Sequence, residues 1–332
     1  MKIDFEHNMS AHCENGVISN LLKHKGIELS EPMIFGIGSG IFFTYLPIMK
    51  LNGIPVTSFR PYPGLIFKNA TRALGIKMFT KRFRNPAKAM RELDISLAKG
   101  IPTGMVVGVY HLTYFPAPYR FHFNAHNIVA FGKEGDNYLI SDPVMETPQP
   151  LSTKDLIRVR YAKGIGMPKG KMYYIKSISK NTDINKAIIR GLKRTAFTMT
   201  RLPGPIIGVT GMKYLSKQIR KWPKKLGKRR ASQYLGQIVR MQEEIGTGGA
   251  GFRFLYAAFL QEASKRLNNP ALFEISNEMT AVGDKWRSFA VMAGRICKGR
   301  QTDETYDGIA DLLNEIADDE KAVYRRIEKA LK

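Results

Sequence analysis

The sequence predicts an α+β domain over residues 1–180, followed by an all-α helical domain over residues 181–332. Short runs of β-branched or aromatic residues, bounded by Gly, Pro or Asp, gather before residue 180 and are typical of strands. After residue 180, apolar residues recur with the 3.6-residue period of amphipathic helices. A chain of 332 residues, 44% of them hydrophobic, is long enough for two domains with separate cores.

The first domain is expected to begin with a helix and to continue mainly with strands. An apolar stripe in CENGVISNLLKHKGIEL predicts a helix that starts near Cys13 and is stopped by Gly26. Ser152 and Asp155 have the spacing of a capping box, which predicts a short helix over 152–160. The expected strands are 53–59, 101–110, 126–132, 137–142 and 171–178. The turn GKEGDN joins the third and fourth of these as a hairpin.

The second domain is expected to contain helices separated by strong helix breakers. The helical stretches are 185–199, 231–245, 251–267, 271–296 and 305–331. The breakers between them are Pro203, Pro205, Pro223, Gly246–Gly249 and Asn268–Pro270. No internal repeat is visible.

The composition favours a reduced, cytoplasmic setting. Cys13 and Cys297 lie 284 positions apart and do not make a disulfide framework. The opening MKIDFEHNMS carries charges and lacks the apolar centre of a secretory signal. The longest apolar runs fall short of the roughly 18–20 residues that span a bilayer. We therefore expect a cytoplasmic protein, with the inner face of the membrane as an alternative location.

The net charge of +24 is concentrated in two windows without acidic residues. Residues 32–91 hold ten Lys or Arg, and residues 184–242, in the first half of the helical domain, hold fifteen. Such surfaces attract acidic proteins, anionic lipids or nucleic acid, although a basic face can also serve solubility alone. The residues expected to dock a partner are Lys77, Lys81, Arg82, Arg84, Lys224, Lys225, Lys228, Arg229 and Arg230.

Three residues of the first domain have the chain order of a cysteine nucleophile with its base and orienting acid. Cys13 opens a helix, where the helix dipole favours a thiolate. His126 lies on a predicted strand and could act as base and then as acid. Asp142 ends the next strand, and the hairpin would bring it close enough to fix the imidazole tautomer. A small apolar core residue is the alternative role for Cys13.

At these residues the sequence resembles the butirosin biosynthesis protein H family. The resemblance is carried by the HC pair at His12–Cys13 and by LSEPMIFGIGSGIFFTY over 29–45. The helical remainder, with GTGGAGFRFLYAAFLQEAS, resembles the helical domain of unknown function that usually follows. AHNIVAFGKEGDNYLISDP is similar to the His and Asp segment of C39-type peptidases. The resemblance implies a papain-like (C39-like) cysteine domain with Cys13, His126 and Asp142 as its triad.

The sequence departs from the papain-like pattern at one position of the expected site. Papain-like enzymes usually place a Gln six residues before the nucleophile to donate to the oxyanion, and His7 stands there. A histidine N–H can donate such a bond, as can the backbone N–H of Cys13, so His7 is the oxyanion candidate. His12 is the rival base to His126. A metal bound by His7, His12 and Cys13 is disfavoured, because the usual metal-ligand spacings are missing. We expect neither a metal nor a cofactor.

A glycine-rich segment is expected to line the substrate cleft. FGIGSGIFF lacks the full nucleotide-binding signatures, so a phosphate cradle is disfavoured. Close backbone approach beside an acyl group and a tight turn remain the two interpretations. Glu31 is expected to orient this segment or to meet a substrate amine. The predicted cleft residues are His12, Asn15, Glu31, Gly36, Gly38, Gly40 and Tyr45.

The resemblance implies acyl transfer from an acidic acyl carrier protein, through a thioester, to an amine or hydroxyl of a small molecule or lipid. Such a reaction belongs to secondary-metabolite or lipid biosynthesis. A C39-like peptidase or amidase would use the same residues with water as acceptor. A non-catalytic basic module that binds anionic membrane or nucleic acid is the third hypothesis. Zinc-finger, basic-zipper and RNA-binding signatures are missing, which counts against nucleic acid.

Overall fold

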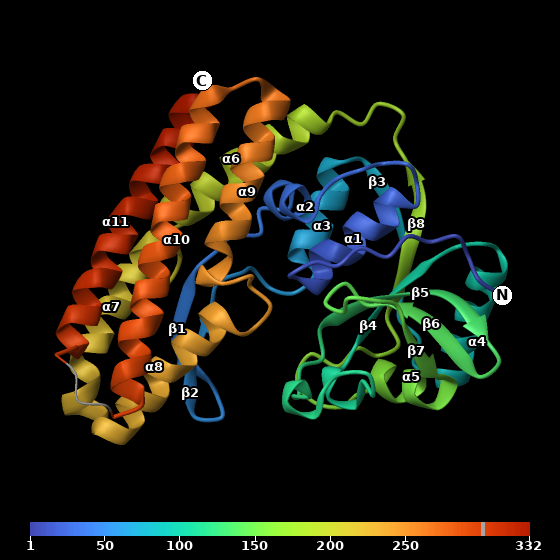
Figure 1. Ribbon diagram of the computed structural model, residues 1–332, viewed down its shortest axis with the longest axis horizontal. Helices are drawn as coiled ribbons and strands as arrows, with labels where there is room; N and C mark the ends of the chain where they lie inside the picture. The colour runs from blue at the N-terminus through green and yellow to red at the C-terminus, as the bar shows by residue number, and fades with distance from the viewer. Residues whose placement is uncertain (300–302) are drawn as a thin grey trace. The chain divides into compact units, whose positions relative to one another are not determined.

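The computed structural model describes residues 1–299 and 303–332, which form two compact units (Figure 1). Unit 1 comprises Met1–Ile34 and Thr71–Thr182, and unit 2 comprises Phe35–Ala70 and Asp183–Lys332. The expected fold class, an α+β part followed by a helical part, is confirmed. A single boundary near residue 180 does not describe the units, however, because residues 35–70 pack with the C-terminal helices.

Unit 1 is built on an antiparallel sheet of strand order β3-β8-β4-β5-β6-β7. The strands are β3 (Ile76–Lys81), β4 (Thr103–Val107), β5 (His126–Glu134), β6 (Asn137–Ser141), β7 (Gln149–Ser152) and β8 (Met172–Ile178). The expected hairpin is present, since β5 and β6 pair across a turn in which Gly135 has a φ of 58°. Four of the strands were predicted, whereas β3 and β7 were not.

Helices cover both faces of this sheet. Helix α1 (Cys13–Lys23) contacts β5, whereas α4 (Pro86–Ala98) and α5 (Thr153–Arg160) contact β4. Two further helices, α2 (Glu31–Ile37) and α3 (Leu65–Ala73), each run from one unit into the other. On β5, Ile128 and Ala130 belong to the core shared with α4 and α5. Phe131 points to the other face and stacks on Phe5, on the side where α1 contacts the strand.

Unit 2 is a bundle of long helices that encloses a buried ion pair. Its helices are α6 (Ile184–Thr200), α7 (Gly208–Leu226), α8 (Lys228–Glu243), α9 (Arg253–Leu267), α10 (Pro270–Cys297) and α11 (Tyr306–Ala330). The fully buried Arg253 donates to both oxygens of Glu320, at 2.8 and 3.0 Å, and the Trp286 indole donates to the same carboxylate. Helix α7 was not predicted, and Pro223, which is expected to break a helix, lies in the last turn of α7.

Unit 2 also contains a two-stranded hairpin from the N-terminal part of the chain. Strands β1 (Thr44–Leu51) and β2 (Ile54–Ser58) are joined by Asn52 and Gly53, both with positive φ, as a type I′ turn requires. Phe43 and Phe59 flank the hairpin and pack on Trp286 of α10. These contacts explain why residues 35–70 belong to unit 2. Across the described residues, no helix combines the length and apolar character needed to cross a membrane.

Candidate active site

Cys13 is the first residue of α1, as predicted, and its side chain is buried. The segment before it is held by the Glu31 carboxylate, which accepts backbone N–H bonds from Ala11 at 2.8 Å and His12 at 2.7 Å. Burial raises the pKa of the Glu31 carboxyl, although these two bonds favour its charged form. Glu31 thus positions the backbone that leads into the thiol, and the helix dipole at that point favours a thiolate.

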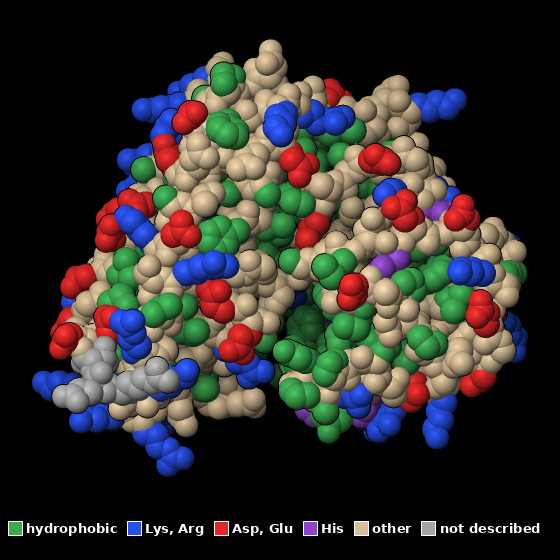
Figure 2. All heavy atoms as spheres, viewed as in Figure 1, with side chains coloured by type: hydrophobic (Ala, Val, Ile, Leu, Met, Phe, Trp, Pro, Cys, Tyr) green, Lys and Arg blue, Asp and Glu red, His purple; other side chains and the backbone are tan. Residues whose placement is uncertain are grey.

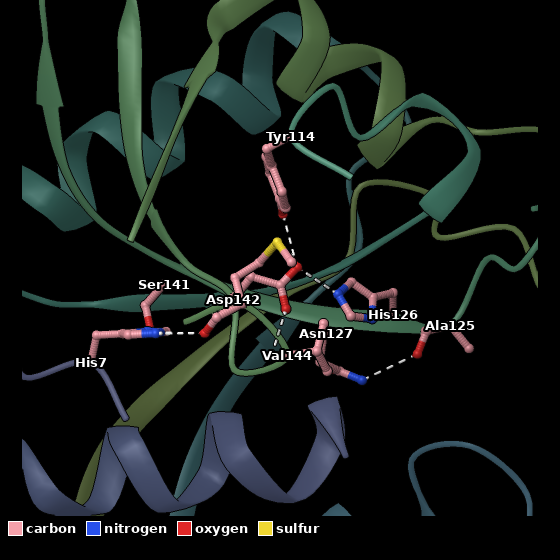
Figure 3. Close-up of polar contacts among 9 residues, drawn as sticks. His7, Tyr114, Ala125, His126, Asn127, Ser141, Asp142 and Val144 are labelled. Carbon is pink, nitrogen blue, oxygen red and sulfur yellow. Dashed lines mark hydrogen bonds and ion pairs between the residues drawn. The ribbon is translucent and has the colours of Figure 1, made fainter. Parts of the chain in front are cut away.

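The hairpin of β5 and β6 brings His126 and Asp142 into contact. Val129 pairs with Ser141, so continuing the register by one residue places Asp142 opposite residue 128, diagonal to His126 on the same face. The two side chains meet at 2.7 Å, between Nε2 of His126 and Oδ2 of Asp142 (Figure 3). The hydrogen bond predicted from the hairpin is therefore present.

The Asp142 carboxylate is fully buried and is held on both of its oxygens. Besides His126, Oδ2 accepts a hydrogen bond from the phenol of Tyr114 at 2.9 Å, and Oδ1 accepts one from the Val144 N–H at 3.2 Å (Figure 3). Burial and the Asp142 charge raise the pKa of Tyr114 well above its usual value. The phenol therefore remains a donor throughout the ordinary pH range and fixes the carboxylate in place.

The imidazole of His126 is buried between two acidic groups. Burial disfavours its charged form, but the negative charges of Asp142 and Cys13, with hydrogen bonds to both, outweigh burial and raise the pKa of His126 to about 10. Since Nε2 is bonded to Asp142, Nδ1 is the ring nitrogen left to face the thiol. The arrangement favours a thiolate–imidazolium pair over a neutral thiol and imidazole.

His7 does not have the geometry expected of an oxyanion donor. Its Nδ1 bonds to the Ser141 hydroxyl at 2.8 Å and its Nε2 to the carbonyl of Met145 at 3.0 Å (Figure 3). The carbonyl can only accept, so Nε2 carries the ring proton of the neutral imidazole and Nδ1 accepts from Ser141. His7 therefore ties the N-terminal segment to the end of β6. Among the described residues, no group of three His, Cys, Asp or Glu side chains is arranged to hold a metal ion.

The predicted cleft residues divide between the two units. His12 and Asn15 are buried at the start of α1, next to Cys13 in the chain, and their contact with a substrate stays a prediction. Gly36, Gly38, Gly40 and Tyr45 belong to unit 2.

Packing within unit 2 explains these residues without a substrate. A Cβ at Gly36 would meet the ring of Phe259 at 2.1 Å, and a Cβ at Gly40 would meet the ring of Phe35 at 2.3 Å. The Gly38 carbonyl accepts a hydrogen bond from Asn69, and the buried Tyr45 ring lies against Tyr214 and Trp222. Gly36 and Gly40 therefore give room to aromatic rings, and a contact of this segment with a substrate stays a prediction.

Several residues around the site were not predicted from the sequence. The buried phenol of Tyr173 donates to Asn127 Oδ1 at 2.7 Å, and burial, together with the charges of Cys13 and Glu14, raises its pKa well above the usual value. Burial and the nearby Arg82 lower the pKa of Lys171, whereas Glu14 opposes this. The carboxylate of Glu14, next to Cys13 in the chain, therefore acts electrostatically on both Tyr173 and Lys171.

The predicted docking residues are exposed in two separate sets. The unit 1 basic set is Lys77, Lys81, Arg82 and Arg84, at and after β3. The unit 2 basic set is Lys224, Lys225, Lys228, Arg229 and Arg230, where α7 meets α8. Their binding to a partner stays a prediction.

Two family models match the chain, and together they cover most of it. Residues 12–143 match the N-terminal domain of butirosin biosynthesis protein H, and residues 154–327 match a domain of unknown function, DUF4872. A search of curated proteins gave no match.

Two of the solved structures to which the chain is similar have low sequence identity to it. One is described as a C39-like peptidase from Bacillus anthracis, with 15% identity and a TM-score of 0.37 over 54% of this chain and 100% of that one. The other is the peptidase domain of the bifunctional ABC transporter ComA from Streptococcus, with 13% identity and a TM-score of 0.32 over 52% of this chain and 97% of that one. The two family matches, of which the first contains the His126–Asp142 hairpin, show that the chain belongs to the family that joins the butirosin biosynthesis protein H N-terminal domain to the DUF4872 domain.

Proposed function

We propose that this chain is a cysteine acyltransferase, in which Cys13 takes an acyl group from a carrier-bound thioester and passes it to an amine or hydroxyl. The observation that carries the proposal is the buried arrangement of Cys13, His126 and Asp142, in which the imidazole bonds to the carboxylate and faces the thiol. A structural cysteine needs no such partners, whereas a nucleophile needs both a base and a group that orients it.

In the first half of the reaction, the Cys13 thiolate attacks the thioester carbonyl. The tetrahedral intermediate collapses with cleavage of the carbon–sulfur bond to the carrier. The leaving thiolate takes the proton from Nδ1 of His126, and the acyl group remains on Cys13. Asp142 holds the ring by Nε2, so that Nδ1 stays directed at the reacting sulfur.

In the second half, the acceptor amine or hydroxyl attacks the acyl group on Cys13. His126 is now neutral and takes the proton that the acceptor loses. The new amide or ester forms as the bond to sulfur breaks, and Cys13 returns as a thiolate beside the imidazolium. Water in place of the acceptor would make the same residues a hydrolase.

The unit 1 basic set is proposed to dock the acidic carrier protein. It lies in the same unit as Cys13, and Arg82 is close enough to influence Lys171, which in turn lies near Glu14. Complementary charge of this kind increases the encounter rate and sets the orientation of the partner more than it adds affinity.

The proposal is tested by incubating the protein with a small acyl thioester, S-acyl pantetheine, and mapping the adduct by mass spectrometry. We expect the acyl group on Cys13 in the wild type and in Cys297→Ala, which removes the other cysteine. Cys13→Ala should carry no adduct and show no turnover. Equal labelling of both cysteines, or an adduct that persists in Cys13→Ala, contradicts the proposal.

Transfer and hydrolysis are separated by adding a primary amine to the isolated acyl-enzyme. A transferase releases the acyl group faster as the amine concentration rises and yields the amide. Release at one rate, as the free acid, whatever the amine concentration, would instead identify a cysteine hydrolase.

A further inference from the structure

The hairpin of unit 2 exposes aliphatic side chains that a folded protein usually buries. Ile48 is 95% exposed, Met49 58% and Leu51 48%. For Ile48 and Met49 the cause is a break in the ladder. Leu46 pairs with Val56 and Lys50 with Pro55, so residues 47–49 have no partner on β2, whereas Leu51, beside the turn, still pairs with Ile54. Such bulges redirect side chains out of a strand. Here the bulge directs apolar groups into solvent.

Helix α8 lies next to this hairpin and brings the side chain of Arg230 to its turn. Tyr234 donates to the carbonyl of Gly53 at 3.3 Å, and the guanidinium of Arg230 approaches the same turn. A surface hollow of about 340 Å³ separates the turn from α8, and Arg230 lines it. Figure 2 shows Lys and Arg side chains gathered at this end of the helical unit, where α7 meets α8 (Figure 1).

The unit 2 basic set is not neutralised within the protein. Among the residues that the structure describes, no carboxylate forms an ion pair with any member of the set. Asp307 and Asp311 of α11 instead pair with Arg220, one turn earlier on α7. The hairpin, α7 and all of α8 except its last residue, Glu243, also fall within the two acid-free windows of the sequence.

We propose that the β1–β2 hairpin and the unit 2 basic set together form a docking surface for an anionic lipid bilayer. The aliphatic side chains of the bulge would enter the boundary between headgroups and acyl chains. The lysines and arginines around it would remain at the depth of the lipid phosphates, as snorkelling side chains do.

The shape and the chemistry of the surface favour a bilayer over a protein partner. The apolar side chains that the hairpin exposes are Ile48, Met49 and Leu51, whereas protein-binding hot spots are enriched in Trp, Tyr and Arg and seldom use Leu. Cations without interspersed acids suit the uniform negative charge of a leaflet, in which each Lys or Arg near the surface strengthens binding about fivefold.

Vesicle flotation tests the proposal, with phosphatidylcholine vesicles compared with vesicles containing one-third phosphatidylglycerol, at 0.1 M salt. Wild type should float only with the anionic vesicles. Lys224→Gln, Lys225→Gln and Lys228→Gln combined should weaken binding about 100-fold. Ile48→Ser, Met49→Ser and Leu51→Ser combined should weaken it tenfold or more, because partial burial of three aliphatic chains is lost.

A matched control removes three exposed lysines from unit 1, with Lys88→Gln, Lys99→Gln and Lys154→Gln, and should float like wild type. All variants should melt like wild type and turn over the small thioester normally, since the substitutions are exposed and lie outside the active site. Flotation is read without any turnover, so its result is independent of the proposed function.

The proposal is overturned if wild type ignores the anionic vesicles or if the hairpin variant floats like wild type. A second set of results would also overturn it: wild type binds an acidic carrier protein but not the vesicles, and the lysine variant binds the carrier protein less tightly than wild type. In that case the surface docks a protein.

Discussion

The Asp142 carboxylate offers the sharpest test of the proposed chemistry, through Asp142→Asn. The amide keeps the shape of the side chain and can still accept from His126 Nε2, but it removes a buried negative charge. An ion pair about 4 Å between charge centres contributes about 4 kcal/mol at an effective dielectric constant near 20, or about 3 pKa units. The pKa of His126 should therefore fall from about 10 to about 7.

The lower pKa of His126 reduces the fraction of Cys13 that is present as thiolate. Proton transfer from thiol to imidazole depends on the difference between their pKa values, so its equilibrium constant drops about 1,000-fold. Alkylation of Cys13 by iodoacetamide at pH 6.5, measured in a Cys297→Ala background, should slow at least tenfold. Turnover should fall by about 10²–10⁴.

Asp136→Asn is the matched control, because Asp136 lies exposed in the turn of the same hairpin. It should alkylate and turn over like wild type. If Asp142→Asn alkylates at the wild-type rate at pH 6.5, the carboxylate does not support the imidazolium and the reasoning is refuted.

Three other outcomes are expected. Glu31→Gln loses a charged acceptor for the backbone before Cys13, so urea unfolding should show a loss of about 1–3 kcal/mol together with slower acylation. Glu320→Gln leaves Arg253 buried without its charge partner and should cost about 3–5 kcal/mol, whereas Glu328→Gln, which breaks the more exposed pair with Arg201, should cost under about 1 kcal/mol. Because the folded pKa of His126 lies above 6.5, its pairing stabilises the protein fully below about pH 6.5 and is lost as the pH rises through about 10. The melting temperature of His126→Gln should therefore change less than that of wild type between pH 7 and 10, and equal slopes would contradict this.

The features predicted correctly are those determined by residues close together in the sequence, such as turns and helix caps. Two β-branched runs around a Gly-Asp turn predict the β5–β6 hairpin, and its register alone brings Asp142 to His126. The capping box at Ser152 is present as well, with the hydroxyl accepting from the Asp155 N–H at 3.1 Å. In these cases the chemistry of neighbouring residues determines the structure.

The failures come from packing between distant parts of the chain. His7 was assigned by its spacing from Cys13, but its ring is captured by Ser141 and Met145, more than 130 residues away. Tyr114 lies in an irregular segment whose path depends on the core beneath it. Strand β1 contains Pro47, which hides a strand, although the Asn52–Gly53 pair is a strong hairpin signal that could have revealed it.

The division of the chain between the two units also determines the order in which the protein can fold during synthesis. Phe43 and Phe59 leave the ribosome early, but Trp286, on which they pack, follows more than 220 residues later. At about 5–20 residues per second, this leaves the hairpin without its partner for roughly 10–45 seconds. The sheet of unit 1 therefore has to form while residues 35–70, which interrupt unit 1 in the sequence, still lack the helices on which they pack. Cutting the chain at residue 180 would make the delay permanent, and the fragment would keep Phe43 and Phe59 without the Trp286 ring on which they pack.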